Sequence, residues 1–114
     1  MARLPNAEKA VIDVEKLQAY ILSPAHPIGR FKAVFFRKLG YSVDNWEAFE
    51  QRLREHILSC DVTKMEESRY GRKFVVEGPM LGLSGDAVQI ISVWVILKGE
   101  DIPRFVTAYP GGLR

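Results

Sequence analysis

The sequence predicts an α+β domain in which three N-terminal helices pack on a four-stranded antiparallel sheet. Apolar residues recur at helical spacing in the first half of the chain, whereas short alternating segments separated by turn residues fill the second half. The 114 residues, 47% of them hydrophobic, can build one core without disulfides or metals. Residues 1–114 are therefore expected to form a single domain.

The first two helices are predicted from their end signals. Asp13 is a good N-cap for a helix that runs to about Leu22. The second helix runs from Pro27 to Leu39, because proline suits the first turn of a helix and Gly40 suits the left-handed residue after its end.

A third helix is expected to reach about residue 58. Asp44 and Glu47 have the spacing of a capping box at its start. Its buried stripe is predicted to contain Trp46, Phe49, Leu53 and Ile57. His56, near the end of this helix, is interpreted as a cation close to the negative end of the helix dipole.

Four strands are predicted after the helices, at residues 61–68, 73–77, 87–97 and 104–109. The run 87–97 is apolar on both alternating faces, so we expect a central strand that is covered on both sides. In the last strand, alternation places Phe105, Thr107 and Tyr109 on one face.

Composition narrows the cellular setting. The lone Cys60 cannot form an internal disulfide and is interpreted as a packing residue, which fits a reducing compartment. The N-terminus lacks the apolar core of a signal peptide, and no stretch is apolar enough for a membrane span. We therefore expect a soluble cytoplasmic protein. A net charge of +2 weakly favours anionic partners, and no cofactor or clustered metal ligands are predicted.

Lys32 is the most informative single residue. At about 100° per residue, the second helix places it within an apolar arc formed by Ile28, Phe31, Phe35 and Leu39. Because removing an ammonium from water costs several kcal/mol unless it is paired, two interpretations are open. Either the side chain reaches solvent from the edge of the arc, or its charge is held against an anion.

Residues near the start of the same helix favour the anion. His26 precedes Pro27 at the helix mouth, where free N–H groups and the dipole favour negative charge. Together, these residues supply the imidazole of His26, the planar guanidinium of Arg30 and the compact positive charge of Lys32. Such groups suffice for metal-independent attack of a ribose 2′-hydroxyl on its phosphodiester. A helix-capping role for His26 is the simpler alternative.

Two further segments carry side chains suited to RNA. On the last strand, Thr107 can hydrogen-bond a phosphate and Tyr109 can stack on a base, although both are also ordinary strand residues. Tyr70 and Arg72 belong to a turn that could form a basic, aromatic lip for substrate binding.

The segments HPIGRFKAVFF and RFVTAYP, with YGRKFVVEGPMLGLSG between them, resemble a bacterial domain of unknown function. That domain is found as a small free-standing protein and at the C-termini of polymorphic toxins. The order of helices and strands and the ending TAYP are also similar to the barnase/EndoU/colicin/RelE-like superfamily of metal-independent ribonuclease toxins. The resemblance implies a fold of that kind over nearly the whole chain.

Residue by residue, the resemblance implicates His26, Lys32, Thr107 and Tyr109 in catalysis, whereas Arg30 is assigned to phosphate binding on chemical grounds alone. It also implies RNA as the substrate and a small neutralising partner protein. The leading hypothesis is an endoribonuclease of toxin type that works by 2′-hydroxyl transesterification, with Tyr109 as a platform for a base or as a proton donor. The alternative is a non-catalytic module of a toxin–antitoxin-like pair that binds a protein or RNA.

Overall fold

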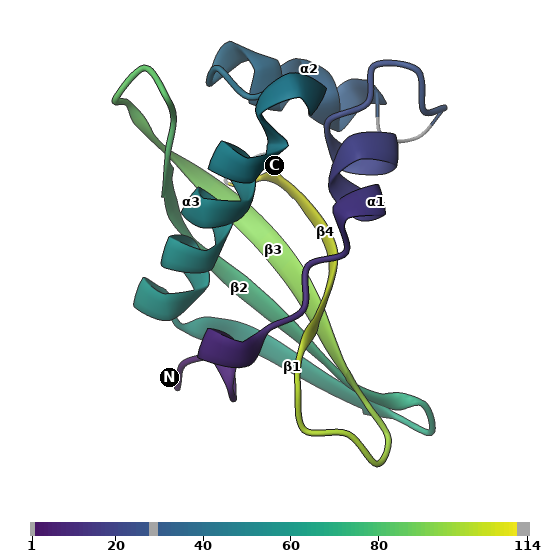
Figure 1. Ribbon diagram of the computed structural model, residues 1–114. Coiled ribbons are helices and arrows are strands. Elements are labelled where there is room, and N and C mark those ends of the chain that lie inside the picture. Colours follow the sequence, from purple (N-terminus) through teal and green to yellow (C-terminus); the bar gives the residue numbers. More distant parts are fainter. Residues whose placement is uncertain (1, 28–29, 112–114) are drawn as a thin grey trace.

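A computed structural model describes residues 2–27 and 30–111. Within these residues the chain is α+β, with three α-helices and one antiparallel sheet of four strands (Figure 1). The helices are α1 (Val14–Lys16), α2 (Arg30–Lys38) and α3 (Trp46–Ser59), with a π-helical turn at Leu17–Ile21 and 3-10 turns at Ala7–Lys9 and Val43–Asn45. The strands are β1 (Val62–Ser68), β2 (Gly71–Leu81), β3 (Ala87–Leu97) and β4 (Arg104–Pro110). The predicted class, sheet and number of helices are confirmed.

The strands follow one another in the sheet in the order of the sequence, so each pair of neighbours is joined by a hairpin. The pairing of β2 with β3 runs without a break from Gly71 opposite Leu97 to Leu81 opposite Ala87. The two outer strands, β1 and β4, are shorter, and each contains a shift in register. The longest and most regular part of the sheet therefore lies in its centre.

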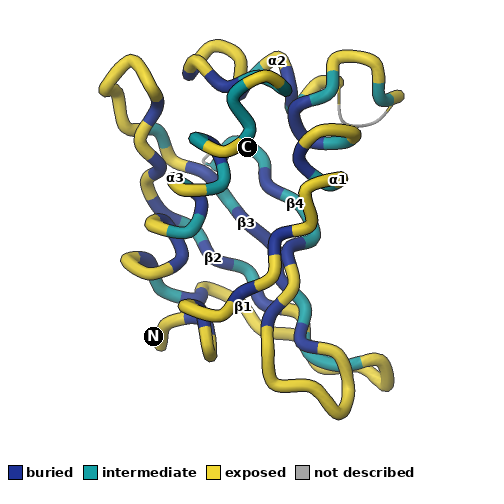
Figure 2. Tube along the Cα trace, viewed as in Figure 1, coloured by how far each residue is buried: buried dark blue, intermediate teal, exposed yellow. Residues whose placement is uncertain are grey.

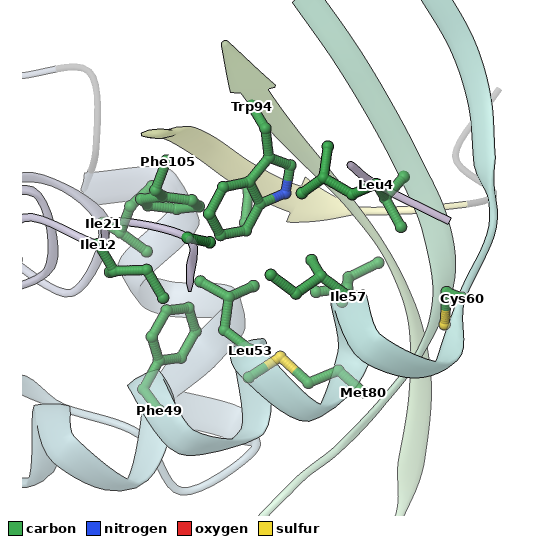
Figure 3. Close-up of a cluster of buried hydrophobic side chains, with 14 of the residues drawn as sticks. Leu4, Ile12, Ile21, Phe49, Leu53, Ile57, Cys60, Met80, Trp94 and Phe105 are labelled. Atoms are coloured by element: carbon green, nitrogen blue, oxygen red, sulfur yellow. The ribbon is translucent and has the colours of Figure 1, made fainter. Parts of the chain in front are cut away.

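The core lies between α3 and one face of the sheet (Figure 3). Phe49, Leu53 and Ile57 of α3 are fully buried, as their helical spacing predicts. They lie close to Trp94 of β3 and Phe105 of β4, whose rings pack edge to face with centroids 5.2 Å apart. Burial of each such side chain contributes about 1.5–3 kcal/mol, so this layer carries much of the stability.

The central strand β3 differs from its prediction on one face. The described helices lie on a single face of the sheet (Figure 1), so the expected cover on both sides is wrong. Val93, on the other face, is nevertheless only 8% exposed, because Val75 and Thr107 flank it in register on the neighbouring strands. Cross-strand neighbours shield this face in place of a second layer.

The last strand does not keep the predicted alternation. Thr107 pairs with Val93 and Phe105 pairs with Trp94, so a β-bulge falls between them. The bulge shifts the side-chain pattern by one residue. Phe105 and Ala108 are both buried, and the expectation that Phe105 shares a face with Thr107 and Tyr109 is wrong. Figure 2 shows buried and partly buried segments following one another along β4.

Two helix predictions also need correction. Asp44 does not cap α3; instead the Asn45 side chain accepts a hydrogen bond from the Ser42 N–H at 2.7 Å and donates one to the Gly40 carbonyl at 2.8 Å. On α2 the buried face is centred on Phe36, which is fully buried, whereas Phe31 is 67% exposed.

The start of the second helix lies partly outside the described residues, and so does Ile28. The Arg30 N–H donates a hydrogen bond to the His26 carbonyl at 3.0 Å. At the other end Gly40 has φ +97°, the left-handed region that favours glycine after a helix. The predicted end of this helix is therefore confirmed.

Candidate functional site

The first helix runs beside the edge strand β4 because the segment before it is hydrogen-bonded to that strand. The Val11 N–H donates to the Pro103 carbonyl, and the Val11 carbonyl accepts from the Phe105 N–H, both at 2.9 Å. Asp13 then caps α1, since its side chain accepts a hydrogen bond from the Glu15 N–H at 3.0 Å. Side chains from α1 and the π turn after it are thereby placed next to β4.

Polar groups from three elements meet at this edge. The Lys32 Nζ of α2 donates one hydrogen bond to the Tyr20 hydroxyl at 2.5 Å and another to the Thr107 Oγ1 at 2.8 Å. The Tyr20 and Thr107 oxygens are themselves 3.2 Å apart. Tyr20 comes from the π turn and Thr107 from β4. We call these three residues the Lys–Tyr–Thr triangle.

The ammonium of Lys32 is partly buried and lacks a carboxylate partner within the described ranges. The ion pairs found in residues 2–27 and 30–111 join other cations to carboxylates, and none of them includes Lys32. Two neutral hydroxyl oxygens compensate only part of its lost hydration. Its positive charge is therefore available to an anion that binds beside it.

The phenol of Tyr20 is shifted toward its ionised form. Burial raises the pKa of Tyr20. Hydrogen bonds from Lys32 and Thr107 and the positive charges of Lys32 and Lys16 lower it by a larger amount, so the resulting pKa lies below the usual 10.0. The Lys16 ammonium is held near this point by a hydrogen bond of 3.5 Å to the Val106 carbonyl. A phenolate at Tyr20 is thus more stable than a phenolate in water.

His26 lies against the same tyrosine. The His26 and Tyr20 rings pack edge to face with their centroids 4.9 Å apart. Both rings line an open pocket of about 580 Å³, whose other lining residues are Asp13, Glu15, Lys16, Ala19, Val106 and Thr107. An imidazole, a phenol and a hydroxyl therefore face one cavity, with the Lys32 ammonium bonded to two of them.

The structure brings together four of the seven residues predicted for the site. His26, Lys32 and Thr107 meet as described, and the ring of Tyr109 lies with its centroid 5.8 Å from the Lys32 Nζ, a cation–π distance. Arg30 does not join them. It is exposed on α2, and its guanidinium carbon lies over the Phe31 ring, 4.9 Å from the centroid.

The predicted lip of Tyr70 and Arg72 is also separate. Tyr70 lies in the β1–β2 turn and Arg72 near the start of β2, at the end of the sheet remote from α2 (Figure 1). Arg72 lines a different pocket, formed with the β3–β4 turn. The ring of Tyr70 is exposed and packs against the neighbouring Arg69 guanidinium at 4.9 Å. Neither residue is placed to contact a ligand that touches Tyr20.

His56 is buried rather than a cation at the helix end, which corrects its sequence interpretation. Its Nδ1 faces the Pro79 carbonyl at 3.3 Å, so this nitrogen carries the proton. Its Nε2 accepts from the Ser92 hydroxyl at 3.0 Å, and Ser92 in turn accepts from the Trp94 Nε1 at 2.9 Å. Burial lowers the pKa of His56, so this network is a neutral, structural part of the core.

In the described part of the chain, the His, Cys, Asp and Glu side chains form no group of three that could hold a metal ion. None of its helices is long and apolar enough to cross a membrane.

Sequence reasoning missed Tyr20 and Lys16, which are central to the pocket. As part of an expected regular helix, Tyr20 was one aromatic residue among many. The observed π-helical turn at Leu17–Ile21 is the feature that marks it, because such turns occur frequently at functional sites. No residue pattern in the sequence predicts this π-helical turn.

Fold and site together define an α+β protein with a pocket at one edge of an antiparallel sheet, lined by hydroxyls, an imidazole and charged side chains of both signs. The chain belongs to the family described as "Domain of unknown function (DUF6883)", which matches residues 3–112. A search of curated proteins finds no match.

A solved structure has a similar fold. It is a chain of the contact-dependent growth inhibition toxin–immunity protein complex from Klebsiella pneumoniae 342, with a TM-score of 0.70 and 20% sequence identity. The similarity covers 91% of this chain and 95% of that one. At this identity it establishes a shared fold.

Proposed function

We propose that this protein is a metal-independent endoribonuclease of toxin type, with a barnase/EndoU/colicin/RelE-like fold, that cleaves RNA in the cytoplasm by 2′-hydroxyl transesterification. The observation that carries this proposal is the partly buried Lys32 ammonium, which has hydroxyl partners but no carboxylate among the described ion pairs. A phosphodiester in the adjoining pocket would supply the missing negative charge.

Each residue then has a specific role. The His26 imidazole takes the proton from the 2′-hydroxyl, and Lys32 stabilises the charge that develops on the phosphate. Thr107 orients the phosphate, and the ring of Tyr109 stacks against a base. The likeness to a chain of a toxin–immunity protein complex supports a toxin-related role and a small neutralising partner protein.

Cleavage of purified RNA in EDTA tests the proposal. The wild-type protein should cut RNA and leave 2′,3′-cyclic phosphate ends. Such ends are recognised because a phosphatase does not remove the cyclic phosphate. His26→Ala should lower the rate by about 10²-fold or more, since a proton-transfer group contributes that much. Its thermal unfolding should match that of the wild type. A His26→Ala variant that cuts as fast as the wild type would remove this residue from the mechanism.

A second candidate is a non-catalytic module that binds a protein or RNA. Its support is the outward side of α2, where Phe31 is 67% and Val34 54% exposed. Exposed apolar side chains close together are typical of docking surfaces. Under this hypothesis RNA stays intact. Binding to RNA that weakens with salt would indicate an RNA-binding module, and salt-independent binding of a protein would indicate a protein-docking module.

A further inference from the structure

The hydrogen bonds within the Lys–Tyr–Thr triangle leave one hydroxyl hydrogen unused. Lys32 can only donate, so the oxygens of Tyr20 and Thr107 both accept from it. Between them these two hydroxyls have two hydrogens, and their mutual contact at 3.2 Å uses one. One hydroxyl hydrogen therefore remains to donate to a group in the pocket.

Tyr20 is the better donor of the two. A phenol is far more acidic than the aliphatic hydroxyl of Thr107. The two nearby ammonium groups also favour the charge that the phenol would acquire on losing its proton, since Lys32 bonds directly to its oxygen and Lys16 lies close by. The tyrosine can therefore give up a proton during a reaction and take it back afterwards.

The position of Tyr20 opposite an imidazole suits a two-group mechanism. Tyr20 and His26 line the same pocket, and their ring centroids are 4.9 Å apart. In cleavage of an RNA phosphodiester, one group must take the 2′-hydroxyl proton and another must protonate the departing 5′-oxygen. Two titratable groups side by side on the wall of one pocket can serve a single phosphate.

We infer that Tyr20 is the general acid of the reaction and that Lys32 stabilises the resulting phenolate. The inference rests on the proposed ribonuclease function. The 2′-oxygen bonds to phosphorus while its proton passes to His26, and the bond from phosphorus to the 5′-oxygen breaks while the Tyr20 proton passes to that oxygen. The products are a 2′,3′-cyclic phosphate and a 5′-hydroxyl. Proton exchange with water then restores both side chains.

Tyr109 is the other tyrosine near Lys32, and the contacts separate the two. The Lys32 Nζ lies over both rings, 4.9 Å from the Tyr20 centroid and 5.8 Å from the Tyr109 centroid, but its hydrogen bond goes to the oxygen of Tyr20. Tyr20 also lines the pocket with His26, and Tyr109 is outside that lining. Tyr109 is therefore suited to stacking, and Tyr20 to proton transfer.

Tyr20→Phe is the direct test, because it keeps the ring against His26 and removes only the hydroxyl. Its rate on ordinary RNA in EDTA should fall by about 10²–10⁴-fold, the contribution of a general acid. Tyr41→Phe is the matched control, because it removes the hydroxyl of a buried tyrosine whose partner is the Leu81 carbonyl, away from the pocket. It should cut RNA at the wild-type rate. Thermal unfolding confirms that both variants fold.

A second substrate separates acid catalysis from positioning. A 5′-bridging phosphorothiolate has a thiolate leaving group, which departs without a proton. Tyr20→Phe should cut this substrate at nearly the wild-type rate, whereas His26→Ala should stay slow on it. A Tyr20→Phe variant that is equally slow on both substrates, or fast on ordinary RNA, would overturn the assignment. If the wild-type protein cuts neither substrate, the ribonuclease function itself is wrong.

Discussion

Replacing Lys32 by methionine should separate stability from activity. Methionine is unbranched and of similar length, so it fills the same space beside the rings of Tyr20 and Tyr109 without the charge. The substitution removes the hydrogen bonds of 2.5 Å to Tyr20 and 2.8 Å to Thr107. It also removes the need to keep an ammonium partly out of water. These two effects oppose each other.

The magnitudes nearly cancel for folding. Hydrogen bonds from a charged group contribute about 1.5–3 kcal/mol each, and desolvation of an ammonium costs several kcal/mol. The two hydroxyls keep their mutual bond at 3.2 Å and line an open pocket, so neither is left without a partner. The free energy of unfolding should therefore change by about 1 kcal/mol or less. Cleavage should fall by about 10²–10³-fold, the effect of removing one group that stabilises transition-state charge.

Urea denaturation and single-turnover RNA cleavage measure the two quantities. Lys38→Met, on the exposed side of the same helix, is the control and should change neither. If Lys32→Met lost 3 kcal/mol or more of stability with its cleavage intact, the ammonium would be a structural cation and the assignment of a phosphate clamp would be wrong.

Two predictions concern the fold. Phe36→Ala should lower the free energy of unfolding by about 3–5 kcal/mol because Phe36 is fully buried. Phe31→Ala, at a residue that is 67% exposed, should change it by about 0.5 kcal/mol or less. Similar urea midpoints for the two variants would contradict this prediction. Burial lowers the pKa of His56 in the folded protein. As the pH falls, His56 therefore takes up a proton near pH 6.5 in the unfolded chain but stays neutral in the folded one. The free energy of unfolding should thus decrease between pH 7 and pH 5. The decrease should be smaller in His56→Gln. If the stability of this variant depended on pH in the same way as that of the wild type, the prediction would be wrong.

Local signals predicted the second and third helices and the positions of the four strands well. The end of α2 at Gly40 follows from the left-handed conformation that glycine adopts without strain. The buried stripe of α3 follows from helical spacing, since Phe49, Leu53 and Ile57 are all fully buried. These features depend on residues that are close in sequence, and a single sequence records them directly.

Features that depend on distant partners were missed. The bulge in β4 places Phe105 in the core and Thr107 against Lys32, but no glycine marks it in the sequence. Likewise, the bridge between Val11 and Arg104, which positions α1, joins residues far apart in the chain. Residue patterns identified Lys32, whereas the tyrosine that it contacts became visible only with the tertiary structure.

Folding alone gives little reason for a lysine in this position. An apolar side chain of similar volume would pack against the rings of Tyr20 and Tyr109 without the loss of hydration, and replacing buried charges by apolar residues is often neutral or stabilising. The hydrogen bonds of Lys32 also end on two hydroxyls rather than on a carboxylate that would neutralise it. A cation kept partly buried and only partly compensated, and bonded to two hydroxyls that line an open pocket, is explained by a ligand that carries the opposite charge. The phosphodiester of the proposed function would use the imidazole and the phenol as well, as acceptor and donor of protons.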